Sequence, residues 1–265
     1  MKQRIIDNLR ESCPWQDSLL WFDSIDSTNA KARELAKQGA PHGTVLIADH
    51  QTGGRGRRGR SFHSPAGVGI YMSVVLRPNC EPQALMHLTC ATAVAMCDAV
   101  EHSARFRPGI KWTNDLVFNK RKIAGVLTEL SFTNQGLVDF AVIGIGINCC
   151  QQEDDFPEDI RHIAGSLESV SGKKIDRAEV AAAMMDALYR MDQQLQSNKA
   201  VILDQYRTDC ITIGQEISLV RGDEVRYGKA LDINSEGALI VQFSEGTTEI
   251  VNSGEVSVRG MYGYV

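Results

Sequence analysis

The chain has 265 residues, of which 43% are hydrophobic and 23% charged, enough for one large domain or for a main domain with a small second one. Its 28 Lys and Arg residues against 33 Asp and Glu give a net charge of -5, which excludes a general electrostatic attraction to nucleic acid or to a membrane surface. Apolar runs such as 91–97 and 140–146 are far shorter than the roughly 20 residues of a membrane span, and residues 1–10 lack the apolar centre of a secretory signal. We therefore expect a cytoplasmic protein with no membrane segment.

The cysteines are odd in number and show neither a C-x-x-C pair nor another zinc-binding spacing. They are Cys13, Cys80, Cys90, Cys97, Cys149, Cys150 and Cys210. We expect reduced thiols that mostly fill the core. The alternative is a catalytic cysteine paired with one of the six histidines, although no family signature surrounds any cysteine.

The order of apolar and polar residues predicts helices and strands along the whole chain. Helices are expected at 2–11, from Asp26 or Ser27 to Gly39, at 82–104 and at 177–208, and strands at 19–22, 43–49, 68–76, 109–118, 122–132 and 136–147. Asp26 and Ser27 are both suitable caps for the second helix, and Gly39 followed by Pro41 ends it. Short, turn-like connectors join the last three strands, which predicts an antiparallel meander. The acidic residues 153–159 are expected to form a solvated loop.

From Ile213 onward the pattern changes to short alternating runs separated by turns. The runs are 217–220, 225–233, 238–243, 247–251 and 256–258. Such a pattern predicts a small β-barrel. We expect two domains, 1–212 and 213–265. The main body is assigned to the α+β class, with a mixed, largely antiparallel sheet flanked by helices.

A loop directly after the strand predicted at 43–49 is unusually basic. Residues 53–60 read GGRGRRGR, so four glycines let the backbone approach a phosphate and four arginines offer bidentate contacts to phosphate or carboxylate. The segment also matches the dinucleotide-binding pattern G-x-G-x-x-G and nearly matches a P-loop, but residues 61–65 cannot begin the helix that both motifs need. A flexible, exposed basic loop without a ligand is the alternative.

Polar and charged residues lie within and after the strand predicted at 109–118. Asn114 and Asp115 are suited to hold Mg²⁺, which prefers oxygen ligands shared with substrate phosphates, and Lys122 would lie near them across a hairpin. The alternative is a surface ion pair between Asp115 and Lys122, worth less than about 1 kcal/mol. Two glycines in the run GIGIN at 144–148 indicate close approach by a ligand or by another backbone.

Taken together, five motifs resemble those of the biotin protein ligases, in the order in which that family has them. The motifs are Asp26-Ser27-Thr28-Asn29, Gln51 with GRGRRGR at 54–60, KWTNDL at 111–116, KIAG at 122–125 and GIGIN at 144–148. The resemblance runs from about Ser24 to Gly260 and implies the biotin/lipoate ligase fold, similar to class II synthetases, with an SH3-like barrel at the C-terminus. It also implies a reaction in which biotin attacks the α-phosphate of MgATP to give biotinoyl-adenylate and pyrophosphate. A lysine of a biotin carboxyl carrier protein of acetyl-CoA carboxylase then takes the biotinoyl group.

The resemblance also implies roles for individual residues. Lys122 would bridge the biotin carboxylate and the α-phosphate, and it is expected to be catalytic together with Arg55 and Arg57. The residues implied for biotin are Ser27, Thr28, Asn29, Gln51, Gly54, Arg55, Lys122 and Gly125, with the GIGIN and KIAG strands along the valeryl chain. Those implied for ATP and the adenylate are Arg55, Arg57, Arg60, Phe62, Asn114, Asn148 and Arg259, and those for Mg²⁺ are Asn114 and Asp115.

Two residues depart from the family pattern, because Phe62 stands where Trp is common and Thr113 where Pro is common. Only 26 residues precede Ser27, so we expect the form without an amino-terminal DNA-binding domain, and no binding to DNA; a homodimer stays open. A lipoate-protein ligase is the nearest enzymatic alternative, since it shares the fold and the adenylation chemistry. The alternative from another class is a nucleic-acid-binding module that uses the arginine loop, against which the net charge and the lack of interleaved aromatic residues argue.

Overall fold

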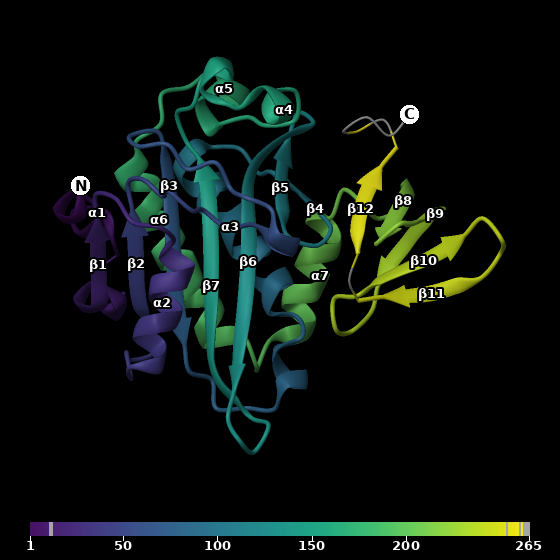
Figure 1. Cartoon of the computed structure of the whole chain (residues 1–265), viewed down its shortest axis with the longest axis horizontal. Helices are drawn as coiled ribbons and strands as arrows, with labels where there is room; N and C mark the ends of the chain where they lie inside the picture. Colours follow the sequence, from purple (N-terminus) through teal and green to yellow (C-terminus); the bar gives the residue numbers. More distant parts are fainter. Residues whose placement is uncertain (11–12, 253, 260, 262–265) are drawn as a thin grey trace.

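The computed structural model describes residues 1–265 apart from 11–12, 253, 260 and 262–265. Its main body is built on a seven-stranded mixed sheet with the order β1-β2-β3-β7-β6-β5-β4 (Figure 1). The strands are β1 Leu19–Phe22, β2 Thr44–Ala48, β3 Gly69–Leu76, β4 Gly109–Lys111, β5 Asp115–Phe118, β6 Arg121–Phe132 and β7 Val138–Asn148. β1 and β2 pair in parallel, and the remaining neighbours pair antiparallel. The predicted α+β class with a largely antiparallel sheet is therefore confirmed.

Helices cover both faces of this sheet. The helices of the described chain are α1 Lys2–Asn8, α2 Thr28–Lys37, α3 Leu88–Ala104, α4 Glu158–Arg161, α5 Leu167–Ser171, α6 Arg177–Gln194 and α7 Lys199–Asp209. On one face α3 packs against α6 and α7, and on the other α2 lies over β2, β3 and β7 (Figure 1). Ser27 is the N-cap of α2, since its hydroxyl accepts from the backbone N–H of Ala30. This cap fixes the start of α2, so Thr28 and Asn29 lie in its first turn.

The most apolar helix belongs to the core of the main body. Pro82–Ala104 is long and apolar enough by composition to cross a membrane, but 72% of its most apolar window is buried inside the fold. The segment begins with a 3-10 turn, Pro82–Leu85, and continues as α3. Because α3 packs against α6 and α7, burial in the protein core accounts for its composition.

The strand predicted at 109–118 is wrong in extent. It is two strands, β4 and β5, paired antiparallel with Lys111 opposite Asp115. The turn between them contains the buried Trp112, whose indole N–H donates to the carbonyl oxygen of Gly237 at 3.0 Å. The polar residues Thr113 and Asn114 belong to this turn, which divides the predicted strand in two. The predicted meander is confirmed for β5, β6 and β7, which pair antiparallel in succession.

Two other predicted segments also differ from the structure. The helix expected at 177–208 is divided into α6 and α7 by a turn at 195–198, where Asn198 becomes the N-cap of α7. The Asn198 side chain makes no capping hydrogen bond, so only its position marks the start of α7. The acidic loop expected at 153–159 contains a 3-10 turn and the first residues of α4.

A second sheet follows the main body, with the strand order β11-β10-β9-β8-β12 and antiparallel pairing throughout. Its strands are β8 Glu216–Arg221, β9 Glu224–Ile233, β10 Leu239–Phe243, β11 Thr248–Val251 and β12 Glu255–Val258. The predicted C-terminal β structure is confirmed. This sheet lies beside α7 (Figure 1), where Arg207 pairs with Asp232 and Lys199 with Glu236. The division into domains between 212 and 213 stays a prediction.

All seven cysteines are free thiols, and five of them are buried. Burial raises the pKa of Cys90 to about 12 and that of Cys150 to about 11. A thiol with a raised pKa is a poor nucleophile near neutral pH, because the thiolate is the reactive form. The expectation of reduced cysteines that fill the core agrees with these positions.

Candidate active site

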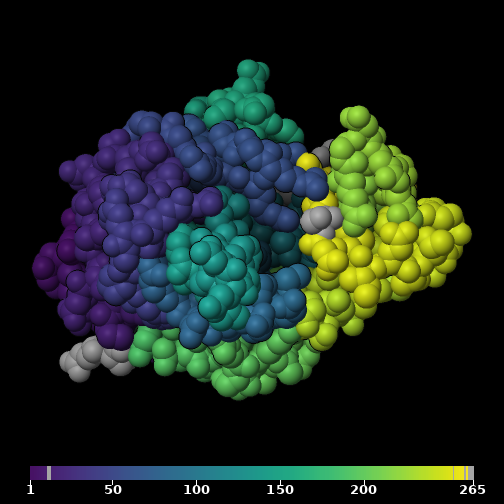
Figure 2. All heavy atoms as spheres, turned by 60° about the horizontal axis from the view of Figure 1, so that its bottom comes forward, coloured from purple at the N-terminus to yellow at the C-terminus, as the bar shows by residue number. Residues whose placement is uncertain are grey.

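A cavity opens between the main body and the C-terminal sheet, and Figure 2 shows the molecule hollowed there. From the main body it is lined by the N-terminus of α2, the basic loop, the β4–β5 hairpin and the middle of β6 and β7. From the C-terminal sheet it is completed by Gly254, Glu255 and Val256. The motifs found in the sequence therefore meet in one place, together with residues that come much later in the chain.

One end of the cavity is neutral and densely hydrogen-bonded. Thr28 donates from its backbone N–H and from its hydroxyl to Gln51 Oε1, at 2.8 and 3.0 Å. The fully buried Ser73 hydroxyl lies 2.6 Å from Asn29 Oδ1 and 2.8 Å from Thr28 Oγ1. Asn29 Nδ2 donates to Glu129 Oε2 at 3.0 Å. Because these groups hold one another in place, this end is preorganised for a small, uncharged polar ligand.

Glycines on β6 and β7 form a floor beside the neutral end. Gly125 lies opposite Gly146 in the register of the two strands. A Cβ atom on Gly144 would lie 1.9 Å from Asn29 Oδ1, and one on Gly146 would lie 2.4 Å from Phe62 Cε1. Other side chains therefore approach this floor so closely that only glycine fits. The glycines of GIGIN were predicted to allow a ligand or another backbone to approach closely. In the structure, the side chains of Asn29 and Phe62 approach them.

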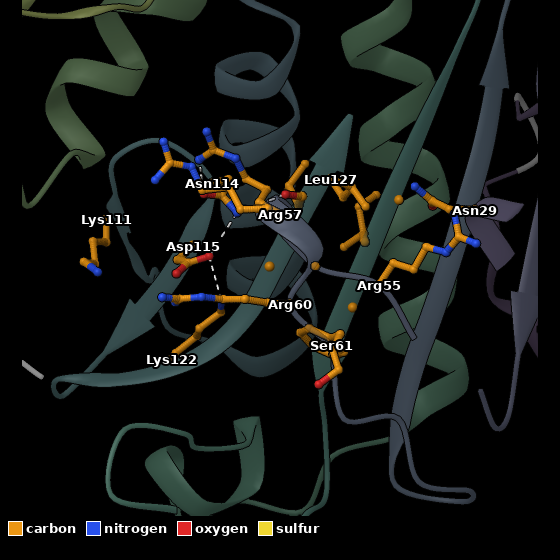
Figure 3. Close-up of a pocket in the computed structure, with 18 of the residues that line it drawn as sticks. Asn29, Arg55, Arg57, Arg60, Ser61, Lys111, Asn114, Asp115, Lys122 and Leu127 are labelled. Carbon is orange, nitrogen blue, oxygen red and sulfur yellow. Dashed lines mark hydrogen bonds and ion pairs between the residues drawn. The ribbon is translucent and has the colours of Figure 1, made fainter. Parts of the chain in front are cut away.

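The other end of the cavity is charged (Figure 3). Lys122 Nζ lies 2.7 Å from Asp115 Oδ1. Arg57 donates to Asn114 Oδ1 at 2.8 Å, while Asn114 Nδ2 donates to Asp115 Oδ1 at 3.1 Å and to the carbonyl oxygen of Val126 at 3.0 Å. Since a carbonyl oxygen only accepts, these contacts fix which way the Asn114 amide faces. Asn114 thus holds Arg57 in the cavity.

Two arginines connect the basic loop to the C-terminal sheet. Arg60 Nη2 lies 2.5 Å from Glu255 Oε2, and Arg58 donates to the carbonyl oxygen of Val220 at 3.3 Å. The Arg55 side chain extends toward the neutral end instead (Figure 3). The loop therefore spans the cavity and presents cations along its length.

The cavity lining is strongly basic. Its charged residues are Arg55, Arg57, Arg58, Arg60, Lys111 and Lys122 against Asp115 and Glu255, a formal charge of four positive. Burial lowers the pKa of Arg57 and that of Lys111, although the nearby Asp115 carboxylate opposes both shifts. Withdrawing cations from water costs free energy. A cationic cavity in a chain of net charge -5 is therefore typical of a site that binds a polyanion.

Comparison with known proteins identifies the family. Residues 21–148 match the biotin/lipoate A/B protein ligase family, and residues 212–259 match the biotin protein ligase C terminal domain. Over 236 residues the chain is 38% identical to the bifunctional ligase/repressor BirA of Bacillus spizizenii, a match that covers 89% of this chain and 72% of that protein. The chain belongs to the biotin protein ligase family.

Other members of the biotin protein ligase family match over nearly their whole length. The biotin--[acetyl-CoA-carboxylase] ligase of Paracoccus denitrificans is 31% identical, and the match covers 89% of this chain and 98% of that protein. The biotin protein ligase from Aquifex aeolicus, solved in complex with biotin and ATP, is 32% identical with a TM-score of 0.76, over 91% of this chain and 98% of that chain. The family and the fold predicted from the sequence are therefore confirmed.

The cavity brings together most residues to which the family resemblance gave a role. They are Ser27, Thr28, Asn29, Gln51, Arg55, Arg57, Arg60, Phe62, Asn114, Asp115, Lys122 and Gly125. Their individual roles in the reaction stay predictions. Phe62, to which the resemblance gave a role in binding ATP and the adenylate, rests on Gly146 in this structure.

Three residues with a predicted role lie outside the cavity lining. A Cβ atom on Gly54 would lie 2.3 Å from the carbonyl oxygen of Phe62, so this glycine serves the close packing of the loop. Asn148 is buried and donates to the carbonyl oxygen of Gly165 at 2.9 Å. Arg259 is exposed just after β12. The structure thus does not gather these three with the other predicted residues.

The cavity also contains residues that received no role from the sequence. Lys111 and Trp112 precede Asn114 in one motif, and Leu127 follows KIAG on β6. Lys111 could have been predicted as a site residue, because it is a lysine at the end of a short apolar run. Glu255 had no such signal, because only the packing of the two sheets brings it to the cavity.

The two residues predicted to hold Mg²⁺ differ in what they offer. The only side-chain oxygen of Asn114 accepts from Arg57, so Asn114 does not fit as a metal ligand. The Asp115 carboxylate fits as a single contact, since Mg²⁺ usually takes one or two carboxylates together with substrate phosphates and water. Within the described part of the chain, no group of three or more His, Cys, Asp or Glu side chains gathers to hold a metal ion.

Proposed function

We propose that this chain joins biotin to ATP in the cavity and then transfers the biotinoyl group to a lysine of the biotin carboxyl carrier protein of acetyl-CoA carboxylase. One observation carries the proposal: a neutral hydrogen-bonding end, a glycine floor and a cationic end follow one another in a single cavity. Biotin has the same layout, with an uncharged ureido ring, an apolar valeryl chain and a carboxylate. The carboxylate then lies where the cations would hold the phosphates of ATP.

In this arrangement the neutral end holds the ureido ring. Ser27, Thr28, Asn29 and Gln51 are the hydrogen-bonding residues at this end. The first N–H groups of α2 have no partner within the helix and add donors there. The valeryl chain lies over the glycines of β6 and β7, and Phe62 moves aside to admit it.

Adenylation needs cations because it brings a carboxylate against a polyphosphate. Two like charges about 4 Å apart repel by roughly 4 kcal/mol at an effective dielectric constant near 20. Lys122 offsets this repulsion by binding the biotin carboxylate and the α-phosphate together, while Arg57 stays fixed by Asn114 at 2.8 Å. The carboxylate oxygen bonds to the α-phosphorus, the bond to the bridging oxygen breaks, and pyrophosphate leaves with the electron pair.

The second half-reaction uses the same cavity. Arg55, Arg57 and Arg60 close over the biotinoyl-adenylate and shield it from water. The amine of the carrier lysine attacks the biotinoyl carbonyl carbon and loses a proton, and AMP leaves. Mg²⁺, when bound with ATP, supplies further positive charge to the phosphates, and Asp115 is the residue that would hold it.

The mass of an acetyl-CoA carboxylase carrier domain tests this function directly. After incubation with the chain, MgATP and biotin, we expect the carrier to gain one biotinoyl group. A carrier whose target lysine is replaced by arginine, or a mixture without ATP, should show no gain. A carrier modified with lipoate and not with biotin would contradict the proposal and favour the lipoate ligase alternative.

A further inference from the structure

Lys111 is a second lysine in the cavity, and the reaction described above does not use it. It is the last residue of β4, it is 9% exposed, and it lines the cavity. Lys111 lies opposite Asp115 in the register of β4 and β5. The Asp115 carboxylate forms an ion pair with Lys122, which is on β6. Two lysines on different strands therefore flank one carboxylate at the charged end.

A buried ammonium group at this position costs stability. Burial is the main cause that lowers the pKa of Lys111, with the positive charges of Lys122 and Arg60 acting in the same direction. Asp115 and Glu255 act in the opposite direction. An apolar residue would avoid this cost, so the lysine calls for a function that needs its charge.

The order of residues along the cavity fixes the order of the substrate groups. Figure 3 shows Asn29 at one side and Lys111 at the opposite side, with Asp115 and Lys122 between them. With the biotin ring beside Asn29 and its carboxylate at Lys122, the attack on the α-phosphorus comes from the Asn29 side. Attacking and leaving oxygens lie roughly in line in such displacements. Pyrophosphate therefore leaves on the side where Lys111 lies.

We propose that Lys111 binds the β- and γ-phosphates of ATP and stabilises pyrophosphate as it leaves. The inference rests on the proposed function. When the bond between the α-phosphorus and the bridging oxygen breaks, its electron pair adds negative charge to pyrophosphate, and a fixed ammonium group beside it lowers the free energy of that charge. Lys122 acts on the attacking oxygen and Lys111 on the leaving one.

The two half-reactions separate this role from a structural one, because only adenylation involves pyrophosphate. In K111M we expect the KM for pyrophosphate, measured as ATP formation from biotinoyl-adenylate and pyrophosphate, to rise at least about tenfold. Adenylation should slow by about 100-fold. Transfer from supplied biotinoyl-adenylate to the carrier should stay within about twofold of the unmodified chain.

Two further variants serve as controls. K111R keeps the charge and should recover part of the affinity for pyrophosphate. K229M removes an exposed lysine on β9 and should change neither half-reaction.

Three results would overturn the inference or its basis. An unchanged KM for pyrophosphate in K111M would show that Lys111 does not bind the leaving group. If K111M slows transfer from biotinoyl-adenylate as much as it slows adenylation, Lys111 only keeps Asp115 and Lys122 in position. If the unmodified chain neither releases pyrophosphate with biotin nor modifies the carrier, the proposed function itself is wrong, and this inference falls with it.

Discussion

The neutral end and the charged end of the cavity are built in opposite ways. At the neutral end, Thr28 and Asn29 are held mainly by the uncharged side chains of Gln51 and Ser73, and the Glu129 carboxylate accepts from the Asn29 amide group. At the charged end, two cations of the site are held by carboxylates: Lys122 lies 2.7 Å from Asp115, and Arg60 lies 2.5 Å from Glu255. One end is complete before a ligand arrives, whereas the other has partners that a ligand can replace.

The difference follows from the energetics of the two kinds of ligand. A hydrogen bond to a neutral group gains only about 0.5–1.5 kcal/mol net, so its protein partner must be ordered in advance. A phosphate gains much more from a fixed cation, but neighbouring cations repel one another when the phosphate is absent. Acidic partners such as Asp115 and Glu255 relieve that repulsion in the unliganded state. Mutations should therefore affect the two ends by different amounts and in different steps.

The largest effect is expected from Lys122→Ala, which removes the cation at the reacting atoms. Adenylation should fall at least about 100-fold, because a preorganised charge in the transition state is lost. Biotin affinity should change much less, since the ring is held at the neutral end. Pyrophosphate release in the presence of biotin measures the first quantity, and titration calorimetry measures the second. Near-normal pyrophosphate release would remove Lys122 from the reaction; Lys120→Ala, at an exposed lysine in the same hairpin, is the matched control.

Gly144→Ala tests the neutral end, because the added methyl group on β7 would displace the side chain of Asn29. The new Cβ atom would lie 1.9 Å from Asn29 Oδ1, so Asn29 must leave its contacts with Ser73 and Glu129. Unsatisfied buried polar groups cost about 1–3 kcal/mol. We expect biotin to bind about 30-fold more weakly, measured by calorimetry on a variant whose circular dichroism is native. Unchanged biotin affinity would show that the Asn29 network does not order the ring site.

Ser73→Ala is a milder change at the same end. Its hydroxyl has one proton, which it donates to the Asn29 amide oxygen 2.6 Å away, and the variant leaves that oxygen without this donor. Biotin affinity should fall by about fivefold to tenfold, with the KM for ATP at saturating biotin unchanged. A change in the KM for ATP as large as the change in biotin affinity would mean that the two ends are not independent.

The smallest effect concerns the stability of the charged end and its dependence on pH. Burial lowers the pKa of folded Lys111 below its ordinary value of 10.5. The unfolded chain then binds the proton more readily, so the contribution of Lys111 to stability is present above pH 10.5 and is lost as the pH falls through the folded pKa. Lys111→Met should therefore unfold at higher urea concentration than the unmodified chain at pH 7.5, and this advantage should shrink at pH 10.5. An advantage that is the same at both pH values would contradict the burial argument.

Local pattern was sufficient to predict much of the fold. β2 and β3 are buried along their whole length, and their continuous apolar runs are typical of such strands. Residue type limited the cap of α2 to Asp26 or Ser27, and the hydrogen bond from Ala30 shows that it is Ser27. The division of the strand predicted at 109–118 was missed, although the turn between β4 and β5 contains Thr113 and Asn114. The contact of Trp112 with Gly237, which lies 125 residues later, has no local sequence signal.

The candidate site divides in the same way. The cations and the hydrogen-bonding residues could be predicted because the motifs contain the side chains themselves, as with Lys122 and Gln51. The orientation of Asn114 toward Arg57 could not, since an amide has the same sequence signal whether it binds a metal or an arginine. Glu255 could not be predicted either, because it reaches the cavity only when the second sheet packs against the main body.

The wall formed by Gly254, Glu255 and Val256 makes the exclusion of water from the cavity depend on both sheets. All the proposed catalytic lysines and arginines come from the main body, but without this wall the cavity around them is open on one side. An active site that excludes water limits the hydrolysis of reactive intermediates. Loosening of the second sheet from the main body would therefore lose the adenylate as free biotin and AMP, even with every proposed catalytic side chain in place.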